Sequence, residues 1–173
     1  MPLAALDALA IPDDVSAPAR NAARVTLVHA APDAPPIAAQ LGDVPLADNL
    51  EYGMVSEPVQ VLAGSLNFVL TTLDGAPLAA QPAQTIAAGR TYTAFVIGTT
   101  TPDTIRVFVV ESAAQEPDPS TQFRFANMTH ATDTLRVYVN REPAPIFPQV
   151  PFGSITNYFA TGQGSHLVEV YRL

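Results

Sequence analysis

Apolar and polar residues alternate with a period of two through a series of short segments of the chain. Residues 24–29 (RVTLVH) begin the series. Residues 91–97 (TYTAFVI) are its clearest member, because β-branched and aromatic side chains dominate them. Between these segments, Leu66, Phe68 and Leu70 fall on one face of an extended stretch. The alternation predicts β-strands that bury one face.

Turn-forming residues separate these segments about every twelve residues, which is the spacing typical of β-sandwiches. Gly42-Asp43 and Asp74-Gly75 are the clearest turns, and the 17 prolines divide the chain into pieces too short for long helices. We therefore expect an all-β fold made of antiparallel sandwich sheets. Further strands are expected at residues 37–41, 55–62, 84–87, 104–110, 123–125, 135–139, 155–159 and 167–171.

The amino-terminal residues 1–23 differ from the rest. Leu3, Leu6 and Leu9 recur every third residue, which indicates one or two helical turns before a proline-bearing linker. Two interpretations stay open: a frayed tail, or an apolar arm that docks on a neighbouring surface. In the second case Leu3, Leu6, Leu9 and Ile11 are candidate interface residues.

The strand pattern restarts after a polar, proline-bearing linker at residues 112–121. Three landmarks recur with the same offset of 100 residues: Arg24 with Arg124, Tyr52-Gly53 with Phe152-Gly153, and Gly64-Ser65 with Gly164-Ser165. We interpret residues 24–111 as one full sandwich copy of roughly seven strands, and residues 122–173 as a partial second copy of roughly four.

A partial sandwich leaves an apolar face and a strand edge uncovered. Three outcomes are open: the partial copy packs on the first copy, the amino-terminal arm covers it, or another subunit completes it by strand addition. Candidate interface residues in the partial copy are its aromatic residues Tyr138, Phe152, Tyr158 and Phe159.

Composition excludes several classes of protein. The 48% of hydrophobic residues suffices for a core, and no apolar run reaches the ~18 residues of a membrane-spanning helix. The net charge is −8 and lysine is absent, which argues against a nucleic-acid partner. Without cysteine, disulfides and thiolate chemistry are excluded.

Two histidine–aspartate combinations are candidates for chemistry. His29 with Asp33, and His130 with Asp133, each place a histidine at a strand end and a carboxylate in the following loop. One interpretation is a metal or acid–base pair. The other is structural, with the aspartate accepting backbone N–H bonds in a turn and the histidine capping the strand. Recurrence in both copies favours the structural interpretation.

Other motifs for chemistry are weak or missing. No nucleophile elbow, phosphate loop or His-x-x-x-His pair occurs, so we expect neither an enzyme nor a cofactor. Carboxylates in the linkers leave weak calcium binding open. Asn127-Met128-Thr129 fits a glycosylation sequon but overlaps a strand end, and we interpret it as structural.

A set of spaced motifs resembles a bacterial family of domains of unknown function, number 4397. They are RVTLVHAAPDAP at residues 24–35, LEYG at 50–53, LAGS at 62–65 and IAAGRTYT at 86–93, with Ala31 in place of the family's usual serine. The resemblance covers residues 24–111, with a partial second copy. It implies a secreted or surface-anchored sandwich of immunoglobulin-like type, often in tandem, with no established catalysis.

Taken together, these patterns favour a non-enzymatic structural or adhesive protein of the bacterial cell envelope or extracellular space. We expect a homo-oligomer or filament that assembles by exchange of a strand or of the amino-terminal arm. The alternative is a module that binds a small molecule or glycan, between the sheets or at the loops after His29 and His130.

Overall fold

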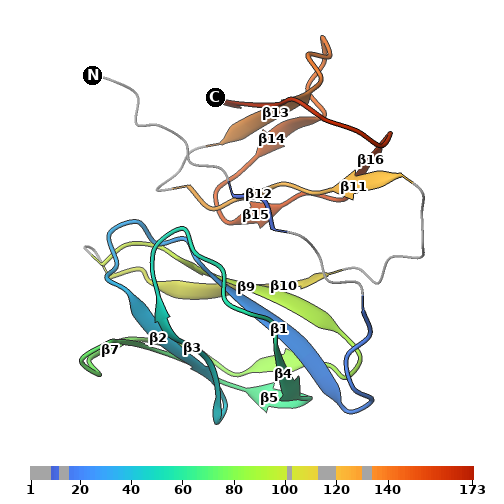
Figure 1. The fold of residues 1–173 in the computed structure, drawn as a ribbon. Helices are drawn as coiled ribbons and strands as arrows, with labels where there is room; N and C mark the ends of the chain where they lie inside the picture. The colour runs from blue at the N-terminus through green and yellow to red at the C-terminus, as the bar shows by residue number, and fades with distance from the viewer. Residues whose placement is uncertain (1–8, 12–15, 101–102, 113–119, 130–133) are drawn as a thin grey trace. The chain divides into compact units, whose positions relative to one another are not determined.

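The computed structural model describes residues 9–11, 16–100, 103–112, 120–129 and 134–173. Within these ranges all regular structure is β-strand (Figure 1). The chain divides into two compact units between residues 114 and 115. They are called unit 1 and unit 2 below, and each is described by itself.

Two four-stranded sheets form unit 1. The first has the order β10-β9-β1-β4 and the second the order β3-β2-β6-β7, while β5 and β8 form a separate pair. The strands of the first sheet are β1 (Ala22–His29), β4 (Val59–Leu62), β9 (Thr91–Ile97) and β10 (Arg106–Ser112). The others are β2 (Ile37–Leu41), β3 (Val44–Leu50), β5 (Gly64–Leu66), β6 (Phe68–Thr72), β7 (Pro77–Ala80) and β8 (Gln84–Ile86).

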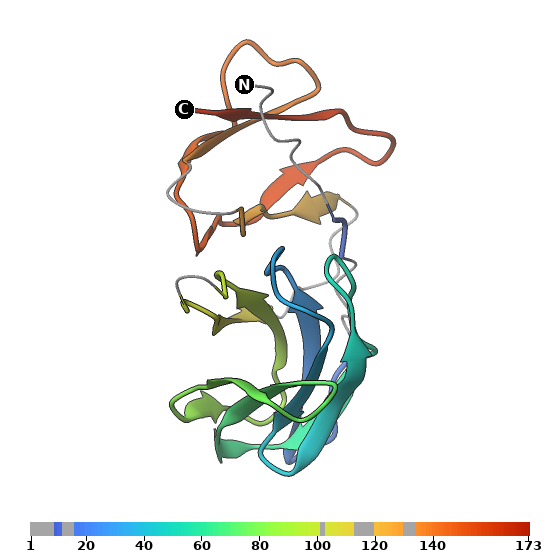
Figure 2. The same ribbon diagram turned by 90° about the vertical axis from the view of Figure 1, so that its left-hand side faces the viewer.

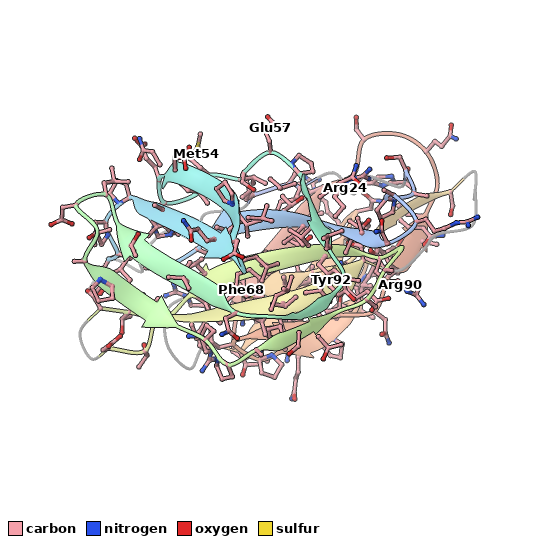
Figure 3. The ribbon with its side chains drawn as sticks, turned by 90° about the horizontal axis from the view of Figure 1, so that it is seen from below. Arg24, Met54, Glu57, Phe68, Arg90 and Tyr92 are labelled. Carbon is pink, nitrogen blue, oxygen red and sulfur yellow. The ribbon has the colours of Figure 1, made fainter. Side chains whose placement is uncertain are left out.

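The core of unit 1 lies between its two sheets, so the expected all-β sandwich is confirmed (Figure 2). Phe68 and Leu70 are fully buried while Val69 between them is 41% exposed, as the alternation in that segment predicts. Figure 3 shows Phe68 and Tyr92 among the strands and Met54 at the periphery. Each large apolar side chain buried in this way stabilises the fold by about 1.5–3 kcal/mol.

One strand pair departs from the expected antiparallel arrangement. β1 and β9 run parallel, with Arg24 opposite Thr91 and His29 opposite Val96. A parallel pair requires a long crossover connection, and here strands β2 to β8 supply it. β1 therefore lies inside its sheet, between β9 and β4, with both edges paired.

Unit 2 consists of smaller sheets. β11 (Thr121–Phe123) pairs with β16 (Phe159–Thr161), and β12 (Ala126–Asn127) pairs with β15 (Ser154–Ile155). A three-stranded sheet has the order β14-β13-β17, formed by β14 (Phe147–Val150), β13 (Leu135–Val139) and β17 (Val168–Arg172).

The strand registers of unit 2 repeat those of unit 1. Ile37 of β2 lies opposite Leu50 and Thr72, and Leu135 of β13 lies opposite Val150 and Arg172. In the same way β11 and β16 pair as β1 and β4 do: Val25 lies opposite Val59, and Phe123 opposite Phe159. Unit 2 therefore holds counterparts of β1 to β4 and of β6, and its described residues form none of β7 to β10.

These registers correct one expected correspondence. The offset between the units is 98 residues in β1 and β2 and becomes 100 only from β3 onwards, because the hairpin after β13 is two residues longer. Arg24 thus corresponds to Gln122 and not to Arg124, whereas Gly53 and Gly153 do correspond. The constant offset of 100 misplaced the first strand by two residues.

Candidate binding surfaces

His29 is fully buried at the end of β1. The backbone N–H of Ala31 donates to Nδ1 at 3.3 Å, so the ring proton sits on Nε2, which donates to the Pro35 carbonyl at 3.2 Å. Burial lowers the pKa of His29 below its ordinary value, although the bond to Pro35 acts in the opposite direction. The ring is therefore neutral at pH 7, and both nitrogens are engaged inside the protein.

The segment after β3 wraps around the same residue. Gly53 donates its N–H to the His29 carbonyl at 2.8 Å, and His29 donates its own N–H to the Met54 carbonyl at 3.1 Å. The Tyr52 ring meets the imidazole edge-on, with the centroids 6.2 Å apart and the planes at 87°. Residues 29–35 and 52–54 are called the His29 corner below.

Asp33 holds two loops of unit 1 together. Its Oδ2 accepts hydrogen bonds from the N–H and the hydroxyl of Thr100, at 3.0 and 2.9 Å. His29 and Asp33 thus each have a structural partner of their own. In the part of the chain that is described, no group of three or more His, Cys, Asp or Glu residues could hold a metal ion. His130 and Asp133 lie outside that part.

The counterpart of His29 in unit 2 is Asn127, which corrects the expected match with His130. Gly153 donates its N–H to the Asn127 carbonyl at 2.8 Å, as Gly53 does to His29. The Asn127 side chain is fully buried. Its Oδ1 accepts from the N–H and hydroxyl of Thr129, and its Nδ2 donates to the Val150 carbonyl at 2.8 Å. The sequon asparagine is therefore part of a buried turn.

Of the expected amino-terminal arm, the structure describes residues 9–11 and residues from 16 onwards. Leu9 is 49% exposed and Ile11 is half-buried. Leu3 and Leu6 lie outside the described residues.

The aromatic candidates of unit 2 are all half-buried. The Arg124 guanidinium lies 4.8 Å from the centroid of the Tyr158 ring, a cation–π contact. Phe159 packs edge-on against Phe123 and Phe147, with centroids 5.4 and 6.5 Å apart. These two candidates thus contribute to packing within unit 2. Phe152 precedes the turn at Gly153, and Tyr138 lies on the outer face of β13.

Positions of unit 2 that face its interior are less covered than their counterparts in unit 1. Val168 of β17 is 43% exposed, and its counterpart Phe68 is fully buried. Val170 is half-buried, and its counterpart Leu70 is fully buried. No described strand pairs with β11 on the edge that β9 covers on β1. Both differences match the absence of counterparts of β7 to β10 among the described residues of unit 2.

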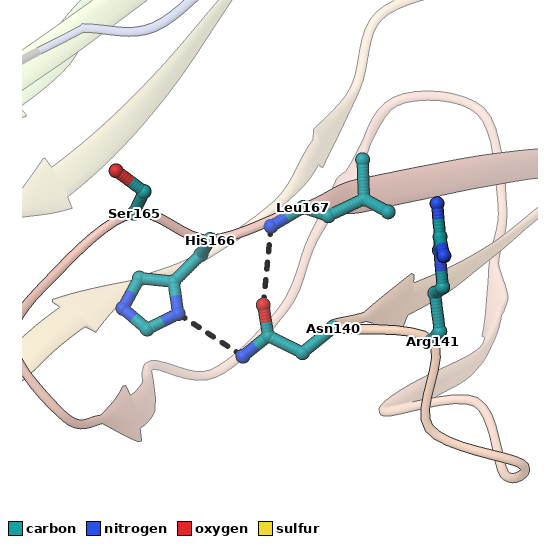
Figure 4. A pocket seen from close by; sticks show the side chains of 5 residues that line it. All are labelled: Asn140, Arg141, Ser165, His166 and Leu167. Carbon is teal, nitrogen blue, oxygen red and sulfur yellow. Dashed lines mark hydrogen bonds between the residues drawn. The ribbon is translucent and has the colours of Figure 1, made fainter.

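The longer hairpin after β13 is fastened to the start of β17 (Figure 4). Asn140 and Leu167 exchange two hydrogen bonds: the Asn140 N–H donates to the Leu167 carbonyl at 2.8 Å, and the Leu167 N–H donates to Asn140 Oδ1 at 3.1 Å. Asn140 Nδ2 lies 3.1 Å from His166 Nδ1. Asn140 and Arg141 both adopt positive φ, 55° and 58°. The turn therefore sets the direction in which the exposed Arg141 side chain leaves the hairpin.

The fold and these contacts define a β-sandwich protein with a buried hydrogen-bonded corner in each unit. The family model of the domain of unknown function DUF4397 matches residues 23–138, and the chain belongs to this family. No curated protein matches the sequence. In the described ranges, no helix has the length and apolar character needed to cross a membrane.

Proposed function

We propose that the protein is a non-enzymatic structural or adhesive component of the bacterial cell surface or extracellular space, and that it self-associates through unit 2. The observation that carries this proposal is the exposure of Val168 where the counterpart Phe68 is fully buried. An interior position that stays open at one side is a place for another chain to bind.

The small core of unit 2 supports the proposal. Among its described residues the fully buried apolar side chains are Leu135, Val137, Val139 and Val150. So few buried side chains stabilise a unit of this size only weakly, since small domains bury too little apolar surface to offset the loss of conformational entropy. Added apolar cover would therefore stabilise unit 2 considerably.

Unit 1 indicates how a partner would bind. β9 runs parallel to β1 in unit 1, and among the described residues no strand takes the corresponding place beside β11. An extended segment of a second copy would lie along β11 and β12 in the same direction, a case of strand addition to an open edge. We assign this role to the apolar arm of the second copy, whose residue Leu9 is 49% exposed.

The His29 corner supports the non-enzymatic part of the proposal. Both ring nitrogens of His29 and one carboxylate oxygen of Asp33 are engaged by neighbouring groups of the protein. A general base or metal ligand needs a lone pair directed at substrate or metal. Fractionation of the source bacterium would test the cell-surface location, and retention in the cytosol would overturn it.

The experiment is light scattering of the full chain over a dilution series, for the wild type and two variants. Val168→Asp places a charge on the open interior face of β17. Val69→Asp is the matched control: Val69 is 41% exposed on the corresponding strand β6, but on its outer face. We expect an oligomer for the wild type and the control, and a monomer for Val168→Asp. A wild type that is monomeric at every concentration, or a Val168→Asp variant that still associates, would overturn the proposal.

A further inference from the structure

We infer that the outer face of β13 and β17 binds an acidic oligosaccharide, one that carries carboxylates on its sugar rings. In the register of these strands, Arg136 lies opposite Tyr171 and Tyr138 lies opposite Glu169. Side chains opposite each other share a face of the sheet. These four therefore stand together on the face opposite the buried Val137.

The four side chains line one surface depression. Its remaining wall consists of Arg141, Glu142, Arg172 and Leu173, from the hairpin after β13 and the end of β17. The whole depression belongs to unit 2. Its four paired side chains, Arg136, Tyr138, Glu169 and Tyr171, stand on the face of the sheet opposite Val168, so the inference does not depend on self-association.

The same strand pair in unit 1 shows that the fold does not require these residues. In the shared register, Arg136 and Tyr138 correspond to Ala38 and Gln40. Glu169 and Tyr171 correspond to Val69 and Thr71. A backbone arrangement that is stable with small and uncharged side chains in unit 1 carries two aromatic and two charged ones in unit 2. Function is set by such added side chains and not by the fold.

The two tyrosines form an ordered aromatic surface. Their rings meet edge to face, with centroids 5.6 Å apart and planes at 88°. Tyr171 is nonetheless 53% exposed. An exposed aromatic ring whose orientation is fixed by a neighbour offers an apolar face for the C–H groups of a sugar, beside polar groups for its hydroxyls. Glu169, whose Oε1 lies 3.5 Å from the Tyr171 hydroxyl, is such a polar group.

Charge favours an acidic ligand over a neutral one. Three of the eight arginines line the depression, with two glutamates, in a protein whose net charge is −8 and which has no lysine. The depression thus holds one more basic than acidic side chain on an otherwise acidic molecule, and its guanidinium groups are the groups that attract anions. Guanidinium groups bind carboxylates in a planar, two-bonded geometry. The Asn140 turn fixes the backbone from which Arg141 reaches toward the depression.

The aromatic rings, guanidinium groups and glutamates of the depression together indicate the class of ligand. A free phosphate or sulfate would use the arginines but not the aromatic faces. A nucleic acid would use both, but nucleic-acid binding relies on a long stripe of basic residues, whereas the depression holds three arginines beside two glutamates. A sugar chain with separated carboxylates matches aromatic rings, guanidinium groups and hydrogen-bond acceptors together.

The test is calorimetric titration of the full chain with oligogalacturonate, with a neutral cello-oligosaccharide of equal length and polyphosphate as comparison ligands. We expect saturable binding of the oligogalacturonate that weakens as salt is added. Tyr171→Ala and Arg141→Ala should each weaken it by about tenfold or more. Tyr52→Ala is the matched control, because Tyr52 is a tyrosine of unit 1 with 46% exposure, and it should bind like the wild type.

Thermal unfolding of each variant establishes that it is folded, and Val168→Asp should retain binding whatever its oligomeric state. Absence of oligogalacturonate binding would overturn the inference. So would equal or tighter binding of polyphosphate or of the neutral oligosaccharide. Unchanged affinity in both Tyr171→Ala and Arg141→Ala would place any binding elsewhere and would also overturn it.

Discussion

Asn127 occupies in unit 2 the position that His29 occupies in unit 1, and it accepts the same backbone hydrogen bond through a different chemical group. Each side chain is fully buried. Each accepts a hydrogen bond from the backbone N–H two residues further along, from Ala31 at 3.3 Å and from Thr129 at 3.2 Å. The position therefore requires an acceptor that closes the turn after the first strand, and an imidazole or an amide meets that requirement.

Replacement of His29 tests this requirement. His29→Ala leaves the Ala31 N–H and the Pro35 carbonyl without partners and opens a cavity, so it should lower the free energy of unfolding by about 2–4 kcal/mol. His29→Asn keeps an acceptor for the Ala31 N–H, so its free energy of unfolding should fall less. Denaturant unfolding measures both values. Equal stability of His29→Ala and the wild type would contradict the structural role.

Lowering the pH should reduce the free energy of unfolding, because His29 takes up a proton. Burial lowers the pKa of His29 below its ordinary 6.5, so the unfolded chain takes up a proton more readily than the folded protein. The associated stability is fully present above about pH 6.5 and is lost as pH falls from there toward the lowered pKa. The stability difference between the wild type and His29→Asn should therefore shrink in this range. Parallel pH curves for the two proteins would contradict the expectation.

Two glycines with positive φ should respond very differently to alanine. At Gly98 (φ 105°) an added Cβ would overlap the carbonyl oxygen of Thr104, whereas at Gly75 (φ 86°) it would meet nothing within 4 Å. Gly98→Ala should lower the free energy of unfolding by about 3 kcal/mol or more, through backbone strain and the clash together. Gly75→Ala carries the strain alone, about 1–2 kcal/mol. Equal losses of stability in the two variants would show that the loop at Thr104 moves aside at little energetic cost.

Asn127 should escape glycosylation even in a host that modifies sequons. Its side-chain amide is buried and bonded at both atoms, so folded unit 2 presents no acceptor nitrogen. The mass of protein secreted from such a host should equal the mass calculated from the sequence. A glycan removed by the Asn127→Gln substitution would mean that the modifying enzyme meets this segment before it is buried.

Three of the strands that the sequence failed to predict share a physical reason. β3, β7 and β14 each contain a proline, Pro45, Pro77 and Pro148, and each lies at the edge of its sheet. An edge strand needs ladder hydrogen bonds on one side only, so it tolerates a residue without an N–H. Strands inside the sheets, such as residues 91–97 with their β-branched and aromatic side chains, carry a stronger local signal and were predicted.

The candidate surfaces, too, could be predicted from the sequence only in part. The sequence predicted the strand at residues 135–139 and named Tyr138 as an interface candidate, but it could not supply the register that sets Tyr171 beside Tyr138, since register depends on pairing between distant strands. His29 and Asp33 were recognised as one motif. Their separate partners, Pro35 and Thr100, come from loop conformations that no local pattern encodes.

The parallel pairing of β1 with β9 has a consequence for synthesis on the ribosome. β1 emerges long before residues 91–97, so one of its edges stays unpaired while β2 to β8 are being made. A nascent unit 1 therefore passes through a stage much like the set of strands that the described residues of unit 2 form. A segment that binds beside β11 in the way proposed above would also fit that nascent stage. The interval before residue 97 emerges is thus the time during which a neighbouring polypeptide on the same messenger can pair wrongly with the growing chain.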